Sequence, residues 1–288
     1  MSTIITKRQF PNYKVYEMEL AGRPLKLEVG KVCELANAAV VVRYGETTVL
    51  CTATAAPRPR DGIDFFPLSV DFEEKLYAVG RIPGSFMRRE GRPGLNAILA
   101  SRCIDRPIRP LFPSDFRNDV AVVCTVLSVD YDCQPEIAAT IGTSAALAIS
   151  DIPWNGPVGC VNVGYVDGKI IINPNQEQRK VSEMLTTVVA TGEKVVMIEA
   201  GANQVSNEVM LEGIEKGFEE AKKQVALINQ MVAEIGKEKF DYPHADFNEE
   251  LFQKILDFGM EEAMAAMDTD DKNVREARWD VLVDHLPE

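Results

Sequence analysis

Arginines concentrate between Arg81 and Arg117, and they are the residues of this sequence best suited to binding chemistry. The stretch holds eight arginines, three acids and no lysine, a charge of +5 in a chain whose net charge is −13, so the other residues carry −18. Guanidinium groups form paired hydrogen bonds with phosphates and stack on bases. A positive segment in an otherwise anionic chain indicates a site for a polyanion such as RNA.

Six neighbouring side chains form the candidate RNA-binding set: Phe86, Met87, Arg88, Arg89, Arg81 and Arg92. An apolar platform beside cations suits the stacked bases and charged backbone of a single strand. A second set, Arg102, Arg106 and Arg109, could hold a small anion such as citrate or phosphate. Two alternatives stay open: the arginines pair with carboxylates such as Asp105 and brace a loop, or they form a protein–protein surface.

Other chemistries are poorly represented. The six cysteines include no Cys-x-x-Cys pair and the chain has only two histidines, so spacing for a metal site is absent and we predict reduced core thiols. Asp268, Asp270 and Asp271 could hold a metal, but a cap for the following helix is the simpler interpretation. Neither a phosphate-loop nor a dinucleotide-binding glycine spacing occurs.

Period-two alternation predicts that strands position these residues in the first half of the chain. The expected strands are 16–20, 25–29, 38–43, 47–55, 68–72 and 120–129, followed by 158–166, 169–172, 184–190 and 195–198. Asp167 and Gly168 form a strong hairpin signal. Helices are expected near 97–102, over 135–149 with Pro135 in the first turn, and along an apolar stripe from Ile214 to Ile235.

The composition of the sequence changes near Phe240, where an acidic region with a helical pattern begins. Asn248 is a candidate helix cap, ahead of an apolar stripe formed by Leu251, Ile255, Phe258 and Met264. About 45 residues are too few for a robust independent core, so we expect part of a longer protein. No signal peptide opens the sequence and no run of about 18 apolar residues occurs, which favours a soluble cytoplasmic protein without membrane contact.

Two adjoining strings of unusual composition resemble a signature of the polynucleotide phosphorylase family. They are DFFPLSVDFEEKLYAVGRIPG, from Asp64 to Gly84, and GRIPGSFMRREGRPGLNAILASRCIDRPIRPLFP, from Gly80 to Pro113. The resemblance implies an α+β fold: a first ribonuclease-PH-like β/α core over 1–240, non-catalytic, and part of a small all-α linker domain over 241–288. It also implies a homotrimeric ring whose channel admits single-stranded RNA, and a place in an RNA-degradation complex.

The family is expected to degrade RNA from its 3′ end with inorganic phosphate and Mg²⁺, releasing nucleoside diphosphates. Its channel loop reads Phe-Phe-Arg-Arg, which this chain matches as Phe86-Met87-Arg88-Arg89, with methionine at the second position. Its catalytic core carries a serine-rich phosphate turn and an Asp-x5-Asp-x-Lys metal motif. The matching turn here is 134–139, without a hydroxyl and with Glu136, and the metal motif aligns with Lys180, Thr186 and Val188.

We therefore expect no catalytic residue, no metal and no bound cofactor in this chain, and catalysis by a second core in a longer protein. The chain is then the RNA-channel half of a polyribonucleotide nucleotidyltransferase. The alternative is a non-catalytic, structural or RNA-binding ring subunit of an exosome-like assembly. The sequence beyond Glu288 separates the two hypotheses, because only the first requires a second core with the serine turn and the metal motif.

Overall fold

A computed structural model describes residues 10–244 and 248–285. The chain divides into two compact units, Met1–Pro243 and His244–Glu288, which we call the core unit and the carboxy-terminal unit. The expectation that no signal peptide opens the sequence concerns residues 1–9, which lie outside the described residues. Among the described helices, none is both long and apolar enough to cross a bilayer.

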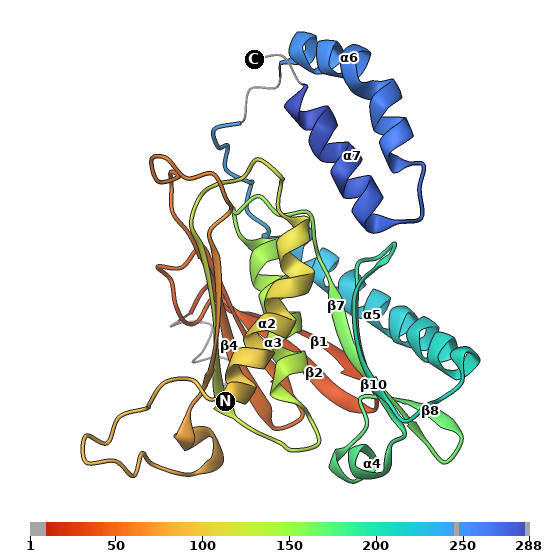
Figure 1. Ribbon diagram of the computed structural model, residues 1–288. Helices are drawn as coiled ribbons and strands as arrows, with labels where there is room; N and C mark the ends of the chain where they lie inside the picture. Colours follow the sequence, from red (N-terminus) through yellow and green to blue (C-terminus); the bar gives the residue numbers. More distant parts are fainter. Residues whose placement is uncertain (1–9, 245–247, 286–288) are drawn as a thin grey trace. The chain divides into compact units, whose positions relative to one another are not determined.

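A six-stranded sheet forms one side of the core unit (Figure 1). In spatial order its strands are β1 (Lys14–Leu20), β2 (Arg23–Val29), β3 (Ala38–Tyr44), β4 (Thr47–Ala55), β6 (Val120–Ser128) and β5 (Leu68–Glu74). All neighbours pair antiparallel except β5 and β6, which are parallel. The expected hairpins are confirmed, and the turn of the first has φ values of 52° at Ala21 and 75° at Gly22.

The second sheet has four antiparallel strands. In spatial order they are β10 (Val195–Ala202), β9 (Met184–Ala190), β7 (Gly159–Val166) and β8 (Lys169–Ile172). The β7–β8 hairpin turns at Asp167 and Gly168 as the sequence predicts, with φ values of 49° and 75°. Strand β10 continues four residues beyond the predicted Ile198, and these four residues pair with β9.

The helix α3 (Pro135–Ile149) is the centre of the core unit, and its bounds match the prediction. Every residue from Ile137 to Ile149 is buried. The helix packs on β3 and β4 on one side and on β7 and α5 (Asn207–Ile235) on the other (Figure 1). Its small side chains allow close approach: a Cβ on Gly142 would lie 2.4 Å from the Cγ2 atom of Val42.

Two shorter helices differ from expectation. The helix α2 (Leu95–Ile108) is longer than the predicted 97–102, because its buried stripe continues to Ile104 and Ile108 and Pro107 falls in the last turn. The helix α4 (Gln176–Val181) was not expected from periodicity. It begins with a capping box, in which Asn175 and Gln178 exchange side-chain to backbone hydrogen bonds of 2.8 and 2.9 Å.

The carboxy-terminal unit is a pair of helices, α6 (Glu249–Met267) and α7 (Lys272–Asp284). Asn248 caps α6 and Asp271 caps α7, so the acidic cluster before α7 is a cap, in agreement with the simpler interpretation. Among the described residues of this unit, Gly259, Ala266 and Leu282 are buried. The predicted apolar stripe of α6 is exposed, which shows that the described part of this unit does not bury it.

Candidate nucleic-acid interface

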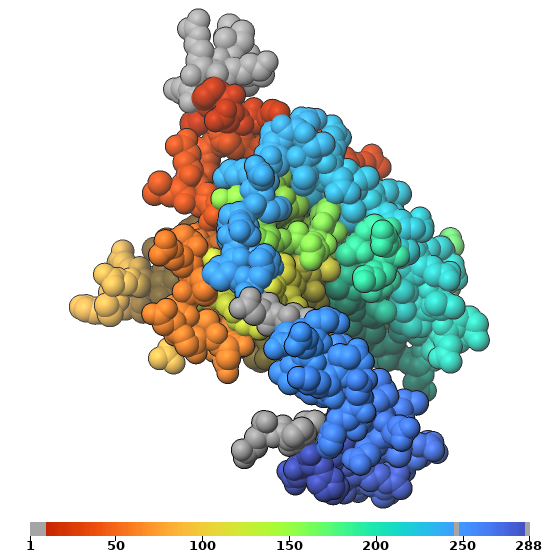
Figure 2. Space-filling view, turned by 90° about the horizontal axis from the view of Figure 1, so that it is seen from above, coloured from red at the N-terminus to blue at the C-terminus, as the bar shows by residue number. Residues whose placement is uncertain are grey.

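The segment between β5 and α2 projects from the core unit as a long loop, shown in orange to yellow at the lower left of Figure 1 and at the left of Figure 2. It begins with the short 3₁₀ helix η1 (Leu76–Val79), which ends at Gly80 with φ 70°. Residues 80–94 follow without regular structure, and we call them the arginine loop. Because it lacks a Cβ atom, Gly80 readily adopts the left-handed backbone conformation with which the chain leaves the helix and turns outward.

The base of the arginine loop is fixed by two acids. Glu90 accepts a hydrogen bond from the backbone N–H of Leu76 at 3.0 Å, which joins the end of the loop to its start. Glu73 forms an ion pair with Lys75 at 2.9 Å. The hydrogen bond from Lys75 lowers the pKa of Glu73, and the same contact raises the pKa of Lys75. The loop is therefore anchored at its base without using its arginines.

The tip presents its side chains to solvent. Phe86 is fully exposed and Met87 is 67% exposed, while Arg88 takes a left-handed φ of 47° within a turn closed by its N–H and the carbonyl of Ser85. The structure brings all six members of the candidate RNA-binding set onto this one loop, and all six are exposed. Within residues 10–244 and 248–285, no ion pair or side-chain hydrogen bond engages Arg81, Arg88, Arg89 or Arg92.

The remaining arginines of the segment differ from these four. Arg106 pairs with Glu199 of β10. Arg109 forms a two-point pair with Asp105, donates to the carbonyls of Phe66 and Leu68, and lies over the Phe66 ring. Arg106 and Arg109 therefore both have acidic partners, and an anion there would have to displace them.

Two more arginines complete the segment. Arg102 is exposed on α2, between the loop and the paired arginines. Arg117 donates to the carbonyls of Ser114 and Phe116 at 2.7 and 3.0 Å, so it braces a turn. The sequence left open whether the arginines bind or brace, and the structure divides them. The four arginines of the loop have no partner among the described residues, whereas Arg106, Arg109 and Arg117 brace the segment after it.

The turn expected to replace a phosphate site begins α3 and lines a cavity. Gln134 is the N-cap residue without a side-chain capping bond, and Glu136 follows in the first turn. Burial raises the pKa of Glu136, its own backbone N–H opposes this, the carboxylate of Glu74 adds to it and Arg179 opposes it. Arg102, Arg106 and Arg109 are not among the residues that line this cavity.

The positions aligned with the metal motif hold no ligand set. Lys180 is exposed on α4 and pairs with Glu177, whereas Thr186 and Val188 are buried in β9. In the described part of the chain, no three or more histidines, cysteines or acids gather closely enough to hold a metal. All six cysteines are free thiols; four are buried, Cys103 is half-buried and Cys33 is exposed.

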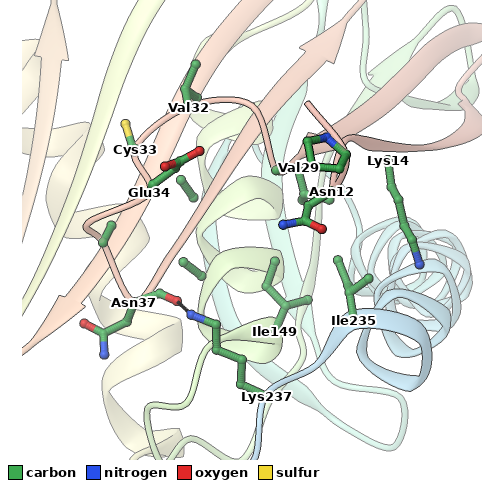
Figure 3. Close-up of a pocket in the computed structure, with 15 residues that line it drawn as sticks. Asn12, Lys14, Val29, Val32, Cys33, Glu34, Asn37, Ile149, Ile235 and Lys237 are labelled. Carbon is green, nitrogen blue, oxygen red and sulfur yellow. Dashed lines mark hydrogen bonds between the residues drawn. The ribbon is translucent and has the colours of Figure 1, made fainter. Parts of the chain in front are cut away.

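A larger cavity of about 670 Å³ lies elsewhere in the core unit, between the start of β1, the loop after β2 and the ends of α3 and α5 (Figure 3). Its two lysines are engaged: Lys14 lies 3.6 Å from Glu234, and Lys237 donates to the carbonyl of Asn37 at 2.5 Å. None of the candidate RNA-binding residues lines it. We assign it no chemistry.

Comparison with known proteins identifies the family. Residues 21–153 match domain 1 of the 3′ exoribonuclease family, and residues 156–220 match domain 2 of the same family. The chain belongs to the 3′ exoribonuclease family. Its 15%-identical structural neighbour, rice Rrp46, superposes with a TM-score of 0.57 over 78% of this chain and 96% of that one, which supports the α+β ribonuclease-PH-like fold.

Relatives of this 3′ exoribonuclease family member confirm the resemblance to polynucleotide phosphorylase, also named polyribonucleotide nucleotidyltransferase. The chain is 55% identical over 272 residues to that of Ruminiclostridium cellulolyticum, covering 94% of this chain and 39% of the relative. It is 53% identical over 268 residues to that of Clostridioides difficile, covering 93% and 38%. The chain thus spans about two fifths of the length of these relatives.

The polar lining of the α3 cavity was not predicted from the sequence. Asn162 of β7 and Thr187 of β9 lie in it beside Gln134. The available signal was an asparagine inside the apolar run of β7, since a buried amide within a strand needs dedicated hydrogen-bond partners.

Proposed function

We infer that this chain is the amino-terminal, RNA-guiding part of a longer polyribonucleotide nucleotidyltransferase, a phosphorolytic 3′→5′ exoribonuclease of RNA degradation. One observation carries this role: Phe86, Met87 and four arginines without partners among the described residues share one projecting loop. Guanidinium groups contact the phosphates of a single strand, and the apolar pair supports its bases. The identity to polyribonucleotide nucleotidyltransferases over nearly the whole chain supports the assignment.

In this proposal catalysis belongs to a second core in the longer protein. A phosphate site needs hydroxyls and free amides at a helix start, but this chain offers Gln134 and the carboxylate of Glu136 there. A metal site needs paired carboxylates, but Lys180 and Val188 stand at the aligned positions. Inorganic phosphate and Mg²⁺ would serve the second core, in a cytoplasmic homotrimer that could join a degradation complex.

RNA binding is tested by fluorescence anisotropy with labelled oligo(A) between 50 and 300 mM salt. Because each phosphate contact adds about 0.7 to the salt slope for a single strand, Arg88→Ala/Arg89→Ala should lower the slope by about 1.4 and weaken binding several-fold. The matched control Lys222→Ala/Lys223→Ala removes the same charge from exposed pairs on α5 and should bind as the parent does. Equal losses in both variants, or none in the first, refute the loop assignment.

Catalysis is tested separately by incubating the chain with poly(A), phosphate and Mg²⁺. We expect no nucleoside diphosphate, whereas robust release would overturn the non-catalytic assignment. Reading the gene beyond Glu288 tests the alternative of a non-catalytic ring subunit. A second core with a serine turn and an Asp-x5-Asp-x-Lys motif supports the enzyme; a stop codon supports the ring subunit.

A further inference from the structure

A cavity of about 270 Å³ opens in the core unit at the start of α3, walled by α2, β7 and β9. Its polar lining includes Gln134, Glu136, Asn162 and Thr187, and none of the residues that line it is a lysine or an arginine. Among these lining residues, Glu136 is the only one with a full charge. A cavity with one carboxylate and no lysine or arginine disfavours phosphate and other anions.

One oxygen of the Glu136 carboxylate lacks a hydrogen-bond donor. Its Oε2 atom is buried and has no partner among the described residues. A buried acceptor without a donor is costly, and such atoms in native proteins usually indicate a missing water or ligand. Because Glu136 also lines the cavity, a ligand N–H group that reaches its carboxylate from there would supply a donor.

Beside the carboxylate lies a set of oriented amides. Thr187 donates through Oγ1 to Asn162 Oδ1 at 2.6 Å, and Asn162 donates through Nδ2 to Gln134 Oε1 at 2.6 Å. These bonds orient the Gln134 amide, because its oxygen is occupied as an acceptor. Its Nε2 group remains a donor for which the described residues supply no hydrogen bond. The cavity thus offers acceptors at Glu136 and a donor at Gln134.

The walls of the cavity are apolar. Leu99 of α2 and Leu185 of β9 line it and are 52% and 37% exposed, and Ile137 lines it from α3. A ligand in the cavity would cover part of this exposed apolar surface, which favours binding. Apolar side chains of this kind bind a planar ring, as they do in enzymes that bind an unstacked base.

We propose that this cavity binds a guanine base. Guanine has two adjacent N–H donors, N1–H and N2–H, which match the carboxylate of Glu136, and next to them the O6 acceptor, which matches the Gln134 Nε2 donor. Adenine and cytosine would place a ring-nitrogen lone pair against the carboxylate. An ammonium group has donors only and leaves Gln134 unmatched. The base can come from a free nucleoside or from an RNA strand, and binding needs none of the arginine-loop contacts, so the inference does not depend on the proposed function.

The test is isothermal titration calorimetry, which measures the affinity of the chain for guanosine, 1-methylguanosine, inosine, adenosine and inorganic phosphate. Guanosine should bind, inosine several-fold more weakly because it lacks N2–H, and 1-methylguanosine, adenosine and phosphate at least about tenfold more weakly. The octanucleotides U₇G and U₈ separate a strand-borne base from a nucleoside: preference for U₇G extends the site to RNA, and equal binding restricts it to the nucleoside.

Glu136→Gln should weaken guanosine binding about tenfold, because the amide presents a donor to the ligand's own donors. The matched control Glu177→Gln, whose side chain is 78% exposed on α4, should bind as the parent does. Arg88→Ala/Arg89→Ala should also leave guanosine binding unchanged, so failure of this site and failure of the RNA loop can be told apart. Equal affinity for guanosine and adenosine, or no guanosine binding at millimolar concentration, overturns the proposal even if Glu136→Gln fails to fold.

Discussion

Gln224 of α5 forms two hydrogen bonds with the backbone of Cys160 in β7: its Oε1 accepts from the N–H at 2.8 Å and its Nε2 donates to the carbonyl at 3.0 Å. The side chain is fully buried. Strand β8 pairs only with Val163–Val166 of β7, so an amide from a helix takes the place of a neighbouring strand at Cys160. Asn173 bonds the same strand at Asn162. Its side-chain Oδ1 accepts from the backbone N–H of Asn162, and its backbone N–H donates to the Asn162 carbonyl.

Gln224→Leu should destabilise the core unit by about 2–4 kcal/mol, since it leaves a buried N–H and a buried carbonyl without partners, at roughly 1–3 kcal/mol each. Urea unfolding followed by Trp154 fluorescence, in a Trp279→Phe background, measures this change. The control Gln230→Leu lies on the same helix, where the side chain is exposed and bonds only Glu234. It should change stability by less than about 0.5 kcal/mol. Equal effects of the two variants contradict the prediction.

Gly142→Ala tests the close packing of α3. Helix propensity alone predicts a gain of about 1 kcal/mol, whereas the added Cβ would lie 2.4 Å from Val42 and 2.6 Å from the Cys51 sulfur. Overpacking costs about 1–3 kcal/mol, so we expect a net loss of up to about 2 kcal/mol in the same unfolding assay. Gly201→Ala in β10, where a Cβ meets nothing within 4 Å, is the control. A stabilised Gly142→Ala variant would exclude tight packing of the helix.

Glu136→Gln should raise the melting temperature at pH 7 but not at pH 4. Burial raises the pKa of Glu136, so the folded state ionises this carboxyl at a higher pH than the unfolded state does. The destabilisation by the ionised carboxylate is therefore absent below the pKa of the unfolded state and complete above the pKa of the folded state. Burial is its main cause; Glu74 adds repulsion, and Arg179 opposes it. Each kcal/mol shifts the melting temperature by about 2–4 °C for a unit of this size. A difference that does not change between pH 4 and pH 7 contradicts the assigned cause.

Met87→Phe should strengthen oligo(A) binding about threefold without changing its salt dependence, because it adds stacking surface and no charge. Phe86→Ala should weaken binding about tenfold, again with the same salt slope. Phe86 is fully exposed and Met87 is 67% exposed, so thermal unfolding should not distinguish either variant from the parent. Anisotropy at two salt concentrations provides the measurement. A changed slope in either variant would mean that the loop itself has been rearranged.

Much of the fold could be predicted because its signals are local. Turn residues such as Asp167-Gly168 determine the hairpins, and Pro135 begins α3 where the sequence predicts it. Helix α2 extends beyond the predicted 97–102, because Pro107 lies in its last turn, where a proline removes only one hydrogen bond. Helix α4 is only six residues long and depends on its capping box rather than on periodicity.

The candidate site could be predicted from the sequence only in part. The composition of residues 81–117 indicated an anion-binding segment, but it could not divide the arginines into free and braced ones. The partner of Arg106 is Glu199, 93 residues away, and Arg109 donates to carbonyls 41 and 43 residues earlier. Such partners follow from tertiary packing. The lining of the α3 cavity is drawn from four elements, so the sequence offered only the asparagine within β7 as a signal for it.

The central position of α3 has a consequence for the two family segments of the core unit. Residues 21–153 and 156–220 match separate domain models, yet α3 in the first packs against β7 and α5 in the second. Neither half can exclude water from its interior when it is produced alone. A chain cut between Trp154 and Asn155 should therefore yield two aggregation-prone peptides, which assemble into one folded core unit when they are co-expressed. This site is therefore suited to split-protein complementation.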